Sequence, residues 1–207
     1  PRRKRRDDEL EQLLRGLKLR HLLEIMDREL EWAEEHGPSY SDLLKRLFRQ
    51  EYSAQQDRFL EYRIRRAKIP ERWALQTFPW ERQPGIDRRV IEQLAELDFI
   101  SRGSNLVLIG PTGVGKTGIA SALLLEALYH GYRGLFVLAQ DLFDEMYTTL
   151  ADHSSRKLLN RLVRLDLLLV DEMGYLNLRP EQSNIFFKLM EERYAASRAT
   201  IITTNLD

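Results

Sequence analysis

Cysteine is absent from this chain of 207 residues. Disulfides and thiolate metal sites are therefore excluded, and cysteine usage gives no sign of secretion. Long apolar runs are missing as well, because no stretch approaches the roughly 18 residues that cross a bilayer. The N-terminus is charged and has no apolar segment of the kind found in signal peptides. We expect a cytoplasmic protein that does not enter a membrane.

A net charge is also lacking, since 32 Lys and Arg residues balance 32 Asp and Glu residues. Overall charge therefore gives no indication of a nucleic-acid partner. The chain opens with the basic run Arg2-Arg3-Lys4-Arg5-Arg6, which acidic residues follow at once. This run is either a basic arm that contacts phosphates or a solvated chain end. Because the first residue is Pro1 and not methionine, we expect the sequence to begin inside a longer polypeptide.

A phosphate-binding loop stands in the middle of the chain. Residues 110–117 match the pattern G-x-x-x-x-G-K-[ST], whose glycines let successive backbone N–H groups face a nucleotide's phosphates. Lys116 adds a positive charge for the β and γ phosphates, and the Thr117 hydroxyl can ligate Mg²⁺. The predicted nucleotide-binding residues are Gly110, Pro111, Thr112, Gly113, Val114, Gly115, Lys116 and Thr117.

The loop motif requires a strand before it and a helix after it, because the helix dipole favours an anion at its N-terminus. The apolar run 105–109 is typical of a buried parallel strand. Apolar residues then recur at helical spacing from Ile119 to Leu128, and Gly131 is placed to end the helix. We therefore interpret the motif as a nucleotide site and not as a chance glycine-rich turn.

Three regions with different patterns divide the chain. Residues 1–68 are typical of a small all-α domain, in which Ser39 or Ser41 caps a long helix. Residues 69–86, with three prolines and two tryptophans, form a predicted irregular linker that packs against another part of the protein. Residues 87–207 alternate strands and helices, which predicts an α/β domain with a parallel sheet covered by helices on both faces. The expected strands lie near residues 105–109, 134–139, 165–170 and 199–204.

Two acidic residues follow the apolar run 165–170 directly. We expect Asp171 to help hold the Mg²⁺ of a bound nucleotide, and Glu172 to polarise a water for attack on the γ-phosphate. Adjacent acids are common on protein surfaces. Their place after a buried strand, in a chain with a phosphate loop, favours the catalytic interpretation.

Polar residues in two further places are candidates for function. Asn205 follows the β-branched run 199–204, where its amide could contact the attacking water or the γ-phosphate, although asparagine at a strand end also serves in turns. A basic stripe lies on one predicted helical face and consists of Arg156, Lys157, Arg161 and Arg164. It either contacts DNA phosphates without reading sequence or is an ordinary solvated face.

Together, the loop, the acidic pair and Asn205 resemble Walker A, Walker B and sensor 1 of AAA+ ATPases. The linker run 78–89, the segment 171–174 and the segment 201–205 extend the resemblance to the IstB family, ATPases encoded by insertion sequences. The similarity covers nearly the whole chain, and the bacterial helicase loader DnaC belongs to the same clade.

The resemblance implies a bacterial ATP-dependent protein that binds DNA, forms homo-oligomers on it and assists a partner transposase of the IstA type. ATP and Mg²⁺ are the implied cofactors. The implied catalytic residues are Lys116, Glu172 and Asn205, with Thr117 and Asp171 at the metal. A helical insertion at roughly residues 140–164 is expected to touch DNA, in the region of the basic stripe.

The sequence also departs from the family pattern, since it stops at Asp207. An AAA+ module would continue into a further helix, a last strand and a helical lid. The arginine that completes a neighbouring subunit's site normally lies in that missing part. Within this chain, Arg193 and Arg198 are candidates for contacts between subunits. ATP binding is expected, whereas hydrolysis is expected to need the oligomer and the missing C-terminal part.

Three other functions remain open at this stage. A replicative helicase loader of the DnaC type would have the same site and a helicase as its partner. A non-hydrolysing, nucleotide-switched DNA scaffold would have little use for Glu172. A small-molecule kinase would not need the acidic pair followed by Asn205, nor the helical domain.

Overall fold

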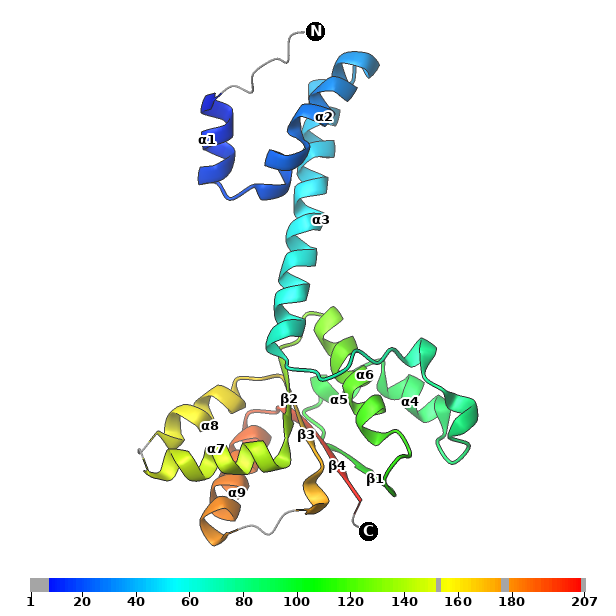
Figure 1. The fold of residues 1–207 in the computed structure, drawn as a ribbon, viewed down its shortest axis with the longest axis vertical. Coiled ribbons are helices and arrows are strands. Elements are labelled where there is room, and N and C mark those ends of the chain that lie inside the picture. The colour runs from blue at the N-terminus through cyan, green and yellow to red at the C-terminus, as the bar shows by residue number, and fades with distance from the viewer. Residues whose placement is uncertain (1–7, 152–153, 176–178, 206–207) are drawn as a thin grey trace. The chain divides into compact units, whose positions relative to one another are not determined.

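The chain forms two compact units, Pro1–Glu61 and Tyr62–Asp207. Figure 1 shows a computed structural model, which describes residues 8–151, 154–175 and 179–205. The long helix α3, Tyr40–Arg66, runs through the boundary between the units. Within the described ranges, no helix is long and apolar enough to cross a bilayer.

The helical unit consists of α1 (Asp8–Gly16), α2 (Arg20–His36) and most of α3. Its core is small and is formed by Leu14, Leu22, Ile25, Met26 and Leu47. Of the two predicted caps, Ser39 begins α3, because its Oγ accepts a hydrogen bond from the backbone N–H of Asp42 at 3.1 Å.

Two buried carboxylates, Glu51 and Glu29, form hydrogen bonds between α2 and α3. Glu51 on α3 accepts hydrogen bonds from the backbone N–H of Leu22 and from Arg58, both at 2.8 Å, and so caps the N-terminus of α2. Burial raises the pKa of Glu51, but these hydrogen bonds outweigh it and leave the pKa below its usual value. The hydrogen bond from Arg46 likewise lowers the pKa of Glu29. Both groups therefore stabilise the unit in their ionised form.

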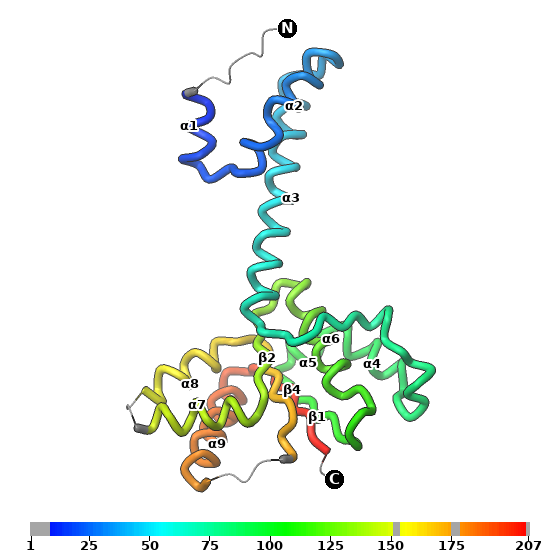
Figure 2. Tube along the Cα trace, viewed as in Figure 1, coloured from blue at the N-terminus to red at the C-terminus, as the bar shows by residue number. Residues whose placement is uncertain are grey.

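A four-stranded parallel sheet forms the centre of the second unit. Its strands are β1 (Leu106–Ile109), β2 (Gly134–Leu138), β3 (Leu167–Asp171) and β4 (Ala199–Thr204). They are arranged in the order β1-β4-β3-β2 (Figure 1), and Figure 2 shows the chain in the same view as a Cα trace. The carboxyl ends of parallel strands meet at one edge, so the residues after β1, β3 and β4 lie near one another.

Helices cover both faces of this sheet, as predicted (Figure 1). Every residue of β3 is buried, because its side chains alternate between two apolar clusters, one on each face. The first cluster involves α4 (Arg88–Leu94), α5 (Asp98–Ser101) and α6 (Lys116–Tyr129). The second involves α7 (Ala139–Ala151), α8 (Ser155–Val163) and α9 (Pro180–Ala195). This is the α/β architecture expected for an AAA+ core.

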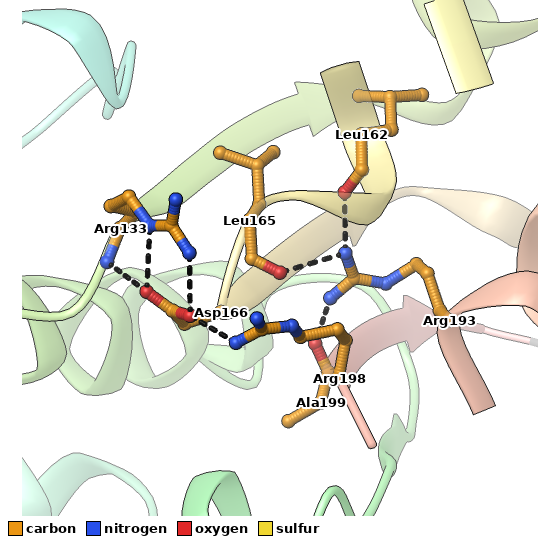
Figure 3. A network of polar contacts seen from close by, with 7 residues as sticks. All are labelled: Arg133, Leu162, Leu165, Asp166, Arg193, Arg198 and Ala199. Carbon is orange, nitrogen blue, oxygen red and sulfur yellow. Dashed lines mark hydrogen bonds and ion pairs between the residues drawn. The ribbon is translucent and has the colours of Figure 1, made fainter. Parts of the chain in front are cut away.

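Arg193, a candidate for contacts between subunits, is instead completely buried in the core (Figure 3). Its guanidinium donates to the carbonyl oxygens of Leu162 at 2.6 Å and Leu165 at 3.1 Å, and to the carbonyl oxygen of Ala199. Burial lowers the pKa of Arg193 to about 10. The prediction of a subunit contact is wrong for this residue, because its donors satisfy backbone carbonyls at the end of α8 and the start of β4.

Arg198 lies beside this network and makes an ion pair with Asp166. Asp166 also accepts hydrogen bonds from the backbone and side chain of Arg133, at 2.9 to 3.2 Å (Figure 3). Arg198 therefore has a partner within its own chain, at the point where β2, β3 and β4 begin.

Candidate active site

The phosphate loop leaves β1 at Ile109 and enters α6 at Lys116, the context that its motif requires. Gly113 and Gly115 have φ angles of 87° and 89°, in the left-handed region that favours glycine. A Cβ atom at Gly115 would also lie 2.8 Å from Cζ of Phe78. At this position both the backbone conformation and the neighbouring ring require glycine.

The ammonium group of Lys116 lies in the bend of the loop. Its Nζ donates hydrogen bonds to the carbonyl oxygens of Gly110 and Pro111, both at 2.8 Å. A lysine ammonium has three donors, so one remains for a phosphate while the loop contacts persist. The N-terminus of α6 adds backbone N–H groups and the positive end of its dipole.

Thr117 and Asp171, the two predicted metal ligands, are in direct contact. The Thr117 hydroxyl lies 3.0 Å from Oδ1 and 3.1 Å from Oδ2 of Asp171. Asp171 ends β3 and is 2% exposed, so its carboxylate is fixed within the sheet. Hydroxyl and carboxylate oxygens suit Mg²⁺, which takes its remaining ligands from water and substrate phosphates. The residues present therefore fit this metal.

Glu172 and Asn205 lie at the same edge of the sheet as the loop. The side chain of Glu172 is exposed to the cleft, and its backbone N–H donates to the Thr203 hydroxyl at 3.0 Å. The Oδ1 atom of Asn205 is buried and accepts no hydrogen bond from any described residue. Leaving such an oxygen without a donor is costly, which favours a role in holding water or a ligand.

Most of these groups border one cleft with a volume of about 430 Å³. Its lining includes Lys116, Thr117, Glu172 and Asn205 from the predicted site. Three other predicted loop residues, Thr112, Gly113 and Gly115, also line it. Gly110 and Pro111 act instead through their carbonyls on Lys116, and Val114 packs beside Gly110. Asp171 lies below the surface, against Thr117.

The linker supplies part of the cleft wall, which the sequence interpretation did not assign to the site. Phe78 is 6% exposed and packs against the phosphate loop, and Trp73 packs beside it with ring centroids 6.2 Å apart. Gln83 donates to the carbonyl oxygen of Gly113 at 3.2 Å. The density of prolines and aromatics indicated packing, but no local pattern could identify the loop as the partner.

Residues 12–207 match the sequence profile of the family described as IstB-like ATP binding protein. The chain belongs to this family. A protein of Pseudomonas aeruginosa, named as an ATP-binding protein of insertion sequence IS21, is 36% identical over 95% of this chain and 74% of that protein. A protein of Geobacillus stearothermophilus, named for insertion sequence IS5376, is 36% identical over 84% of this chain and 69% of that protein.

Solved structures with this fold include replication proteins. The crystal structure of the DnaC helicase loader has a TM-score of 0.52 and 27% identity, and covers 58% of this chain and 68% of that chain. The replication initiator DnaA, bound to AMPPCP and single-stranded DNA, has a TM-score of 0.58 and 23% identity. That match covers 65% of this IstB-like protein and 42% of the DnaA chain. The α/β core therefore has the AAA+ fold.

The basic stripe of this IstB-like protein lies on α8 and its C-cap, and two of its four cations already have partners. Arg156 pairs with Glu192 and Arg161 with Glu145, each at 2.8 Å. Lys157 and Arg164 are exposed, and neither makes an ion pair with another residue in the described part of the chain. The stripe remains a predicted DNA-binding surface, but two of its four positive charges are already paired with glutamates.

Proposed function

We propose that this IstB-like protein is a Mg²⁺-dependent ATPase that binds DNA, forms oligomers on it and assists a transposase of the IstA type in DNA transposition. The observation that carries the ATPase proposal is that Lys116, Glu172 and Asn205 meet around one cleft, where the Oδ1 atom of Asn205 has no hydrogen-bond donor among the described residues. Because the chain spans about three quarters of the IS21 relative and less than half of the DnaA chain, the activity of the whole protein is part of this proposal.

In the proposed reaction, a water molecule attacks the γ-phosphate of ATP, and the bond from its phosphorus to the β–γ bridging oxygen breaks, so that ADP leaves and inorganic phosphate forms. Lys116 and the N–H groups at the start of α6 bind the phosphates, and the Glu172 carboxylate accepts a proton from the water. The Asn205 amide contacts the same water or the γ-phosphate. Mg²⁺, held by Thr117 and Asp171, would neutralise charge on the phosphate oxygens. Trp73 and Phe78 give the cleft an apolar wall that suits a nucleotide base.

DNA binding by the basic stripe is supported by its exposure and by its position on the helices between β2 and β3. Exposed ion pairs such as Arg156–Glu192 are worth only about 0.2–1 kcal/mol, so DNA phosphates can compete for these cations. The insertion-sequence names of the relatives and the DNA in the DnaA structure also support DNA binding. Contacts to the DNA backbone suit such a stripe, because it offers no base-reading pattern.

A helicase loader is the second candidate function, and the likeness to the DnaC loader favours it. The two functions share the ATP site and differ in their protein partner. A scaffold that binds ATP without hydrolysing it is a third candidate. Turnover, which such a scaffold lacks, distinguishes it from the proposed ATPase.

The particle mass on duplex DNA, with and without AMPPCP, tests the proposal. The wild-type protein should form large DNA-bound particles only with nucleotide. Lys116→Ala should lose nucleotide binding and the particles, whereas the exposed control Lys188→Ala should behave as wild type. The double variant Lys157→Glu/Arg164→Glu should keep nucleotide binding, weaken DNA binding and flatten its salt dependence.

Each arm of this experiment can contradict one part of the proposal. Nucleotide affinity that survives Lys116→Ala would refute the phosphate-loop assignment. Particles that stay monomeric on DNA with AMPPCP would refute assembly on DNA. An unchanged salt slope in the double variant would show that the stripe is a solvated face.

A further inference from the structure

Thr203, near the end of β4, contacts both acidic residues of the site and was not among the predicted site residues. We propose that Thr203 is a positioning residue for ATP hydrolysis, whose hydroxyl holds Asp171 and the backbone of Glu172 in the arrangement that turnover requires. This inference rests on the proposed ATPase function and assigns a further residue to the same site.

The chemistry of the groups fixes the direction of both hydrogen bonds. The backbone N–H of Glu172 can only donate, so the Thr203 oxygen accepts at 3.0 Å. An ionised carboxylate can only accept, so the Thr203 proton points to Oδ1 of Asp171. One hydroxyl therefore connects the residue predicted to hold the metal with the residue predicted to activate water.

Glu172 needs such a support because its backbone is strained. Its φ angle of 62° lies in the left-handed region, which is unfavourable for a residue with a side chain. Strain of this kind persists only where the surroundings hold the backbone. The hydrogen bond to Thr203 holds the amide of this residue, so the hydroxyl helps to determine where the Glu172 carboxylate lies.

Thr203 is also well placed to connect these acids with Asn205. β4 pairs in parallel with β3 up to Val170 and Ile202, which brings the next residues, Asp171 and Thr203, side by side. Asn205 follows Thr203 by two residues, close to where the strand ends. Thr203 is 1% exposed, so water does not compete for its hydrogen bonds.

A second threonine on β4 provides the matched control. Thr200 is also fully buried, and its hydroxyl accepts a hydrogen bond from Nε of Arg193 at 3.0 Å, away from the cleft. If the buried hydroxyls of β4 serve only to stabilise the fold, then Thr200→Val and Thr203→Val should have the same effects on stability and turnover. If Thr203 positions the acidic residues, only Thr203→Val should affect turnover selectively.

The test compares Thr203→Val, Thr203→Ser and Thr200→Val in the full chain with duplex DNA. ATP turnover, the affinity for AMPPCP with and without Mg²⁺, and the melting temperature are measured. Valine keeps the shape of threonine without its hydroxyl, and serine keeps the hydroxyl. We expect Thr203→Val to lower kcat by about 10–100-fold with little change in KM, and to reduce the gain in affinity that Mg²⁺ gives. Thr203→Ser should restore kcat to within about threefold, since positioning needs only the hydroxyl.

Three results would overturn the inference: an unchanged kcat in Thr203→Val, a loss in Thr203→Ser equal to that in Thr203→Val, or the same kcat loss in Thr200→Val. If the wild-type protein binds ATP but never hydrolyses it, the proposed function fails separately. The positioning role of Thr203 is then tested by the Mg²⁺-dependent affinity for AMPPCP and by hydrogen exchange at the Glu172 amide. Protection of that amide should be lost in Thr203→Val and kept in Thr203→Ser. Unchanged protection would refute the proposed support.

Discussion

At the scale of single residues, the phosphate loop is shaped by the linker as well as by its own motif. Phe78 packs on the face of the loop where Gly115 has no side chain. Gly113, two residues earlier, has nearly the same φ angle but open space around the position of a Cβ atom. The two glycines therefore separate the cost of backbone strain from the cost of a clash with the linker.

Alanine substitutions at these glycines should have unequal effects. Gly113→Ala bears only the left-handed strain, about 1–2 kcal/mol. Gly115→Ala bears the same strain and also displaces the Phe78 ring, so it should cost about 1–3 kcal/mol more and weaken nucleotide binding further. Thermal unfolding and titration with AMPPCP measure both effects.

The double variant Phe78→Ala/Gly115→Ala checks the cause. Relief of the clash predicts that it loses less stability than the sum of the two single variants. Equal losses in Gly113→Ala and Gly115→Ala would show that the ring does not press on the loop.

At the scale of elements, the helical unit depends on buried carboxylates because its apolar core is small. Glu51 caps α2 from the neighbouring helix and is only 2% exposed. Its pKa in the folded protein lies below the value of about 4.5 expected when unfolded. Its stabilisation is therefore fully present above about pH 4.5, and is lost as the pH falls through the lower, folded-state pKa.

Glu51→Gln should make the helical unit less stable and less sensitive to acid. Loss of the charged hydrogen bonds is expected to cost about 1–3 kcal/mol at pH 7. The further loss of stability on acidification below pH 4.5 should be smaller than in the wild type, since one of the titrating groups is gone. The NMR signal of the Trp32 indole, on α2, can follow this unit during denaturation. The exposed control Glu24→Gln should match the wild type. An acid response in Glu51→Gln identical to that of the wild type would contradict the assigned role.

The elements differ in how far the sequence could predict them. β3 was predictable because an apolar run buried on both faces is continuous in sequence, and the loop because its motif is local. The strand begins at Leu167 and not at 165, since Asp166 is held by Arg133 and Arg198. No local pattern could predict these pairings.

The same limit applies to the site. The roles expected of Lys116 and Asp171 follow from motifs in which each residue has a fixed position. The contacts of Phe78 with Gly115, and of Thr203 with Glu172, join segments far apart in the sequence and leave no periodic signal. The prediction of a subunit contact for Arg193 was wrong for the same reason. The carbonyl oxygens that accept its hydrogen bonds belong to other elements of the chain.

At the scale of the whole molecule, we propose that the cleft hydrolyses ATP and that this turnover releases the protein from DNA. Glu172 is the residue on which this claim depends, because it alone is assigned to take the proton of the attacking water. Glutamine at this position keeps the size of the side chain and removes the base.

The most direct test is to measure ATP turnover, AMPPCP affinity and the lifetime of the DNA complex for Glu172→Gln in the full chain. We expect nearly unchanged affinity for AMPPCP, turnover slowed by about 10²–10⁴-fold and a DNA complex that persists in ATP. Turnover equal to that of the wild type, in a variant that still binds AMPPCP, would contradict the proposal.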